Sequence, residues 1–200
     1  MLLLVVVLNV TSVQLFGQTS LRSGDLLFVK ASGSDFSAAI DAATAVDSLE
    51  SFDHVAIAYL KDTTLFVIEA TPKLGVVCRP YSEFLADCGK QKVVAMRFAG
   101  KVDFKLVIDN ALKYVGQSYD FYFLPDNDKI YCSELVFLSF TNAKGKPLFS
   151  SKPMNFRASD GSMPEYWTKL YQSLGTSIPE GVSGTNPNDM SKDRRLHRLN

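Results

Sequence analysis

The chain has 200 residues, of which 46% are hydrophobic and 21% are charged, and its 21 lysines and arginines balance its 21 aspartates and glutamates. This size and composition fit one globular domain that buries roughly two thirds of the surface exposed by the unfolded chain. Zero net charge excludes the broad attraction that draws basic proteins to nucleic acids or anionic membranes, so any binding must come from a local site.

The first 17 residues have the character of a signal peptide. An apolar run opens the chain, turns polar from Asn9 to Gln14 and reaches the small residue Gly17, with no charge before Arg22. The run is too short to span a bilayer. We therefore expect residues 18–200 to form a single exported domain, periplasmic or extracellular, without strong membrane association. Because the basic residues of a typical signal are missing, a buried first strand or a misassigned start stays open.

Export would place the three cysteines in an oxidising compartment. Cys78 and Cys88 are near neighbours in the sequence and could form a disulfide, which would leave Cys132 as the odd thiol. All three could equally be reduced and buried, because free cysteine is among the most buried residue types.

The first half of the chain predicts a helix and several strands. Residues 24–30 form a Gly-Asp turn that leads into an apolar strand, and the apolar spacing predicts a helix over 35–50. Two β-rich runs, "DHVAIAYL" and "TLFVIEA", are separated by a polar turn around Lys61 and Asp62, which predicts a hairpin. A short helix over 81–88 then joins two further strands, "GVVCRP" and "KVVAMRF".

Helices dominate the second half. One apolar stripe predicts a helix over 103–115, and an apolar run predicts another over 132–142. Ser162, followed three residues later by Glu165, indicates the capping box of a last helix. From about residue 176 the chain has a polar C-terminal tail that ends in the basic "KDRRLHRLN", and we interpret the arginines of this tail as a solvated end. Helices interleaved with a mainly antiparallel sheet predict an α+β fold.

The hairpin contains the most specific indication of a site. If Lys61 and Asp62 form a two-residue loop, His54 faces Glu69 with the Cβ atoms about 5 Å apart. A four-residue loop makes them diagonal neighbours still on the same face, because strand side chains alternate. In either register the imidazole and the carboxylate can meet. The other histidine, His197, lies in the basic tail and is a poor candidate base.

Cys132 begins the helix predicted over 132–142. A thiolate is stabilised by a helix N-terminus and by an imidazolium, which His54 could supply, with Glu69 fixing the orientation of the ring. Each residue also has an ordinary alternative, because most cysteines are core residues and most strand histidines are structural. Glu134 points away from Cys132 on the helix, and we interpret it as a capping or ion-pairing group.

Four segments in this order, "GDLLF", "DHVAIAY", "VIEA" and "YCSELV", resemble the circularly permuted papain-like cysteine hydrolases of the NlpC superfamily, in particular the YiiX/YebB-like branch. The resemblance extends from Ser23 to "GTNPNDMSK" and implies a papain-like fold in which the histidine precedes the cysteine. It also implies that Cys132 is the nucleophile, His54 the general base and Glu69 the residue that orients the base.

Three further residues match the family pattern: Tyr119 and Asp120 before the cysteine, and Tyr131 beside it. The resemblance implies oxyanion or substrate-binding roles for them, although a tyrosine is by default a packing residue with a hydroxyl to satisfy. The backbone N–H of Cys132 at the helix start would be the first oxyanion donor, and Tyr131 is a candidate for the second.

Together these residues predict acyl transfer to cysteine, with an amide in cell-wall peptide as the expected substrate. Related permuted enzymes act on lipid-like acyl groups, so a lipid or acyl-ester hydrolase or acyltransferase is an alternative, and a non-catalytic ligand-binding module is another. We expect no organic cofactor and no metal, because no Cys/His cluster has zinc spacing. We expect no nucleic-acid partner, and the sequence leaves the oligomeric state open.

Overall fold

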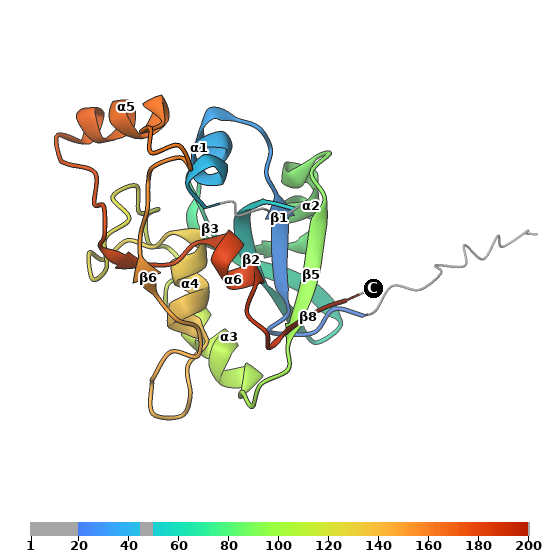
Figure 1. The fold of residues 1–200 in the computed structure, drawn as a ribbon. Helices are drawn as coiled ribbons and strands as arrows, with labels where there is room; N and C mark the ends of the chain where they lie inside the picture. Colours follow the sequence, from blue (N-terminus) through green and yellow to red (C-terminus); the bar gives the residue numbers. More distant parts are fainter. Residues whose placement is uncertain (1–19, 45–49, 200) are drawn as a thin grey trace, which may run out of the picture.

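A computed structural model describes residues 20–44 and 50–199, which fold around one antiparallel sheet (Figure 1). The predicted signal peptide, residues 1–17, lies outside the described residues. The sheet has the strand order β4-β3-β2-β1-β5-β8. Its strands are β1 (Leu26–Lys30), β2 (Phe52–Lys61), β3 (Thr64–Thr71), β4 (Gly75–Pro80), β5 (Val93–Phe98) and β8 (Leu196–Arg198). A separate two-stranded sheet consists of β6 (Lys152–Pro153) and β7 (Ser183–Gly184).

The described ranges contain six helices, so the α+β class predicted from the sequence is confirmed. None of these helices has the length and apolar character that crossing a bilayer requires. Residues 45–49 of the predicted first helix lie outside the described ranges. The helices are α1 (Asp35–Thr44), α2 (Tyr81–Cys88), α3 (Phe104–Leu112), α4 (Cys132–Ser139), α5 (Glu165–Leu174) and α6 (Pro187–Ser191).

Both faces of the sheet are covered. Residues of α3 and α4 pack with Phe28 and Ile57 in the larger apolar cluster, whereas Phe84 of α2 packs with Leu27 and Val67 in a smaller cluster. Leu27 and Phe28 are adjacent in β1 and point to opposite faces. This double coverage explains why β1 is a continuous apolar run instead of an alternating one (Figure 1).

The Gly-Asp turn before β1 is held by an ion pair. Gly24 has a φ of +86°, and a Cβ there would lie 2.1 Å from the ring of Phe104, so both conformation and space favour glycine. The carboxylate of Asp25, 1% exposed, accepts hydrogen bonds from Arg97 Nε at 2.7 Å and Nη2 at 2.8 Å. Arg97 on β5 thereby joins the turn to the neighbouring strand.

The hairpin of β2 and β3 turns at Asp62 and Thr63, one residue later than predicted. Lys61 pairs with Thr64, and Asp62 takes a positive φ of 53°, which aspartate tolerates. The register, continued from the pairing of Ile57 with Ile68, sets Glu69 opposite Ala56. His54 and Glu69 are therefore diagonal neighbours on one face, and the directly opposed register is wrong.

Two predicted helix boundaries also differ from the structure. The helix that begins at Cys132 ends at Ser139, earlier than predicted. The predicted capping box of the last helix is wrong, because α5 begins at Glu165 directly after Pro164, and the hydroxyl of Ser162 donates to Asp160 instead.

The segment after residue 176 packs onto the domain, although the arginines of its basic end are exposed, as expected. Its last strand, β8, pairs with β5 at the edge of the sheet. In α6, Asn188 is 2% exposed; its side chain accepts from the N–H of Phe52 at 2.7 Å and donates to Thr44 Oγ1 at 2.8 Å. These bonds tie the C-terminal segment to the start of β2.

All three cysteines are free, so the disulfide considered between Cys78 and Cys88 is absent from the structure. Cys78 packs against the larger apolar cluster and Cys88 against the smaller one, on opposite faces of the sheet. Their closeness in sequence therefore does not bring the two sulfur atoms together.

Candidate active site

The sheet brings His54 of β2 and Glu69 of β3 into contact. His54 Nε2 lies 2.6 Å from Glu69 Oε2, and the side chains are 19% and 1% exposed. The diagonal register puts both side chains on one face, close enough for a hydrogen bond between them. Because Nε2 is engaged with the carboxylate, Nδ1 is the ring nitrogen left for a third group.

Cys132 is the candidate for that third group, because its side chain interacts electrostatically with His54. The cysteine is 5% exposed and is the first residue of α4, a helix that packs against β2 and β3. The first N–H groups of a helix lack partners within the helix, so the backbone at Cys132 presents hydrogen-bond donors. Glu134 accepts from the N–H of Tyr131 at 3.4 Å, which agrees with its interpretation as a capping group.

The two ring contacts determine where the proton resides. Burial lowers the pKa of His54, but the hydrogen bonds and charges of Cys132 and Glu69 outweigh burial and raise it to about 10. Burial raises the pKa of Glu69, but the hydrogen bonds and charges of His54 and Arg79 leave it below its ordinary value. At neutral pH the site therefore favours an imidazolium beside a carboxylate, which can also stabilise a thiolate.

Arg79 is a member of this cluster that the sequence did not indicate. Its Nε and Nη2 lie 2.7 Å and 2.6 Å from Glu69 Oε1, and its Nη1 contacts Asp87 of α2. Glu69 pairs with Val77 in the ladder of β3 and β4, so Arg79 is a diagonal neighbour of Glu69 on the same face. The only signal in the sequence is a single charge within the apolar strand "GVVCRP".

Tyr119 and Tyr131 line the same cavity as Cys132, whereas Asp120, the third residue that the family pattern indicated, does not line it. The buried carboxylate of Asp120 accepts from the N–H groups of Tyr122 at 2.8 Å and Leu124 at 2.9 Å, so it shapes the loop before α4. The hydroxyl of Tyr131 accepts from the N–H of Thr185 at 3.1 Å.

Tyr119 lies between two cavities. It lines both the cavity beside Cys132 and a second hollow beside His54. Burial, followed by the charge on Cys132, raises the pKa of Tyr119. Its hydroxyl therefore keeps a proton that it can donate to an oxygen of a bound molecule.

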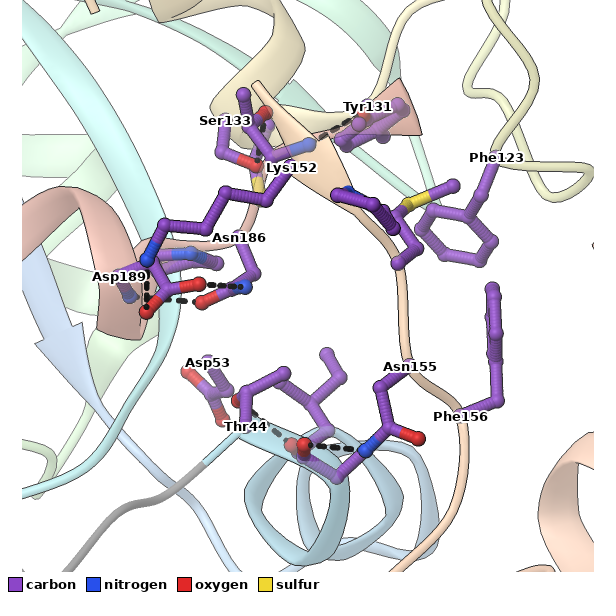
Figure 2. A pocket seen from close by; sticks show the side chains of 18 of the residues that line it. Thr44, Asp53, Phe123, Tyr131, Ser133, Lys152, Asn155, Phe156, Asn186 and Asp189 are labelled. Carbon is purple, nitrogen blue, oxygen red and sulfur yellow. Dashed lines mark hydrogen bonds and ion pairs between the residues drawn. The ribbon is translucent and has the colours of Figure 1, made fainter. Parts of the chain in front are cut away.

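The cavity beside Cys132 has a volume of about 160 Å³ and is divided into an aromatic and a polar side. Figure 2 shows Phe123 and Phe156 on one side, with Lys152, Asn186 and Asp189 on the other. Lys152 Nζ lies 3.2 Å from Asp189 Oδ1. The hollow beside His54, of about 300 Å³, is lined by Glu69 and Arg79 among other residues.

Comparison with known proteins gives concordant results. Residues 20–200 match the family model described as permuted papain-like amidase enzyme, YaeF/YiiX, C92 family. YiiX of Escherichia coli K12, described as uncharacterized, is 29% identical over 161 residues, which cover 79% of this chain and 75% of YiiX. The crystal structure of YiiX from Escherichia coli O157:H7 gives a TM-score of 0.72 at 27% identity and covers 90% of this chain and 96% of that one.

These matches confirm the predicted resemblance and the permuted papain-like fold. The crystal structure of YiiX is described as that of a metalloprotein. Within residues 20–44 and 50–199 of the present chain, no three His, Cys, Asp or Glu side chains are grouped so that they could hold a metal ion.

The raised pKa of His54 gives a direct test of the cluster. We expect the ring to keep its second proton until about pH 10 and the Glu69→Gln variant to titrate at lower pH, because the substitution removes a charge and leaves burial, which lowers the pKa. Imidazole NMR signals followed against pH measure both values, and a His197→Gln variant assigns the two rings. A His54 ring that titrates near the ordinary histidine pKa of 6.5 contradicts the cluster.

Proposed function

The chain belongs to the family of permuted papain-like amidases, and we propose that it is a cysteine hydrolase that cleaves an amide bond through an acyl-enzyme at Cys132. The observation that carries the proposal is the grouping of three side chains. His54 Nε2 lies 2.6 Å from Glu69 Oε2, and the side chain of Cys132 interacts electrostatically with the same imidazole. This arrangement supports the three roles of nucleophile, general base and orienting group.

The proposed reaction has two stages. His54 holds the proton of the Cys132 thiol as an imidazolium, the sulfur of Cys132 attacks the carbonyl carbon, and a tetrahedral oxyanion forms. When this intermediate collapses, the C–N bond breaks and His54 gives its proton to the departing amine. Water then enters, His54 removes one of its protons, and attack on the thioester releases the carboxylic acid and the free thiol. Glu69 supports the imidazolium in both stages without taking its proton.

The oxyanion needs hydrogen-bond donors near the sulfur. The N–H of Cys132 at the start of α4 is the first. We assign the second to Tyr119, because it lines the cavity of Cys132 and the hollow of His54. Tyr131 is less suitable, since it lines only the cavity of Cys132 and its hydroxyl is held at Thr185, whose backbone N–H donates to it.

The two cavities support a division of the substrate. Cys132 lines the smaller cavity, so the acyl half would lie there, against Phe123 and Phe156. His54 lines the other hollow, so the amine that it protonates would leave on that side. Peptide of the bacterial cell wall is the proposed substrate, and the periplasm or cell exterior is the proposed location, as the first 17 residues indicate.

The aromatic side of the cavity favours a second candidate function. Rings and the side chain of Met154 contact the space beside the thiol, and such a surface also suits an acyl chain. Hydrolysis of, or acyl transfer from, a lipid-like ester or amide is therefore the alternative, with the same three residues in the same roles.

Replacing the nucleophile tests the function. We expect Cys132→Ala to reduce the release of peptide fragments from purified cell-wall material by about a thousandfold or more, because the acyl-enzyme can no longer form. Cys88→Ala is the matched control and should retain the wild-type rate. An undiminished digest in Cys132→Ala contradicts the peptidase proposal, and release of fatty acid from acyl esters with no peptide fragments selects the alternative.

Two matched variants test the oxyanion donor. We expect Tyr119→Phe to lower kcat by about a hundredfold with little change in KM, since a donor to the oxyanion acts mainly in the transition state. Tyr131→Phe should lower kcat much less. Steady-state kinetics of both variants, on whichever substrate the preceding assay shows to be cleaved, measure these values. A larger loss of kcat in Tyr131→Phe than in Tyr119→Phe would reverse the assignment.

A further inference from the structure

We propose that Arg79 is a positioning residue for this site. Its guanidinium holds the carboxylate of Glu69 in the one orientation that supports His54. The inference rests on the proposed function, since it concerns how the general base is prepared. Arg79 acts through the carboxylate and does not touch the reacting atoms.

The carboxylate of Glu69 has its two oxygens divided between two partners. Oε2 lies 2.6 Å from His54 Nε2, whereas Oε1 lies 2.7 Å from Arg79 Nε and 2.6 Å from Arg79 Nη2. Glu69 is 1% exposed, so water cannot replace a lost partner at low cost. Without the guanidinium, Oε1 would be a buried charged oxygen in need of a donor, and the carboxylate could turn toward another one.

Arg79 is itself held in place. It extends from β4, its side chain is 12% exposed, and its Nη1 contacts Asp87 of α2 on the side away from Glu69. The planar guanidinium presents several N–H groups in fixed directions, so anchoring one edge fixes the direction of the other. The strand, the guanidinium and α2 thus form a support behind Glu69.

The charges around Glu69 give this support a measurable effect on pH dependence. The groups that interact with Glu69 are His54 from β2, Arg79 from β4 and the Cys88 thiol from α2, and Asp87 interacts with Arg79 and Cys88. Burial raises the pKa of Glu69, and the two cations lower it. Loss of Arg79 therefore raises the pH at which the carboxylate is neutralised, and His54 loses its counter-charge at a higher pH than in the wild type.

The experiment follows the alkylation of Cys132 by iodoacetamide across pH. We expect Arg79→Gln to slow alkylation at neutral pH by about tenfold or more, the scale on which a displaced group costs rate. The fall of the alkylation rate on the acidic side of the pH profile, its acid limb, should move to higher pH in this variant. Arg79→Lys, which keeps the charge, should return the limb toward its wild-type position. Arg97→Gln is the matched control: it makes the same change beside another buried carboxylate, that of Asp25, and should keep the wild-type profile.

A double variant separates positioning from a general loss of stability. If Arg79 acts through Glu69, Arg79→Gln has no further effect on the alkylation profile in a Glu69→Gln background. A wild-type profile in Arg79→Gln, or the same loss in both backgrounds, overturns the inference. A separate result would contradict the proposed function itself: alkylation of Cys132 in the wild type that is no faster than in His54→Ala.

Discussion

The site depends on the hydrogen bond of 2.6 Å between the buried carboxylate of Glu69 and the ring of His54. A carboxylate with 1% of its surface exposed is costly unless cations face it, and here His54 and Arg79 do so. Cys132 and Glu69 together raise the pKa of His54, and the contact with Glu69 leaves the other ring nitrogen for the thiol. The buried carboxylate thus helps to keep the imidazole protonated and fixes its orientation, and the proposed nucleophile gains a partner that can hold its proton.

The fold supplies this contact from three adjacent strands. His54, Glu69 and Arg79 come from β2, β3 and β4, at diagonal positions on one face, so the ladder hydrogen bonds fix their spacing. Cys132 enters from α4 in the helical layer, and Asn188 in the C-terminal segment holds the backbone at the start of β2. Segments that are distant in the sequence therefore position the side chains of the candidate site. This agrees with a permuted fold, in which the site depends on which strands and helices are neighbours in space and not on their order along the chain.

Sequence reasoning predicted the shared face of His54 and Glu69 because it depends only on the alternation of side chains along a strand. It left open whether the two residues are directly opposed or diagonal, because the sequence does not fix the turn residues, which in the structure are Asp62, with its positive φ, and Thr63. Arg79 was missed because its meeting with Glu69 requires the register of a second hairpin. The packing of the C-terminal segment could not be predicted from its composition, since Asn188 is polar and yet buried through three hydrogen bonds to the rest of the domain.

The most direct measurement of the central claim is a competition among the three free thiols of the native protein. Limited iodoacetamide at neutral pH, with the adducts mapped by mass spectrometry, ranks the thiols by reactivity. Cys132 is 5% exposed, whereas Cys78 and Cys88 are only partly buried, so exposure alone favours the latter two. The account predicts that Cys132 is alkylated first and that this preference disappears in His54→Ala. Alkylation of Cys78 and Cys88 ahead of Cys132 would contradict it.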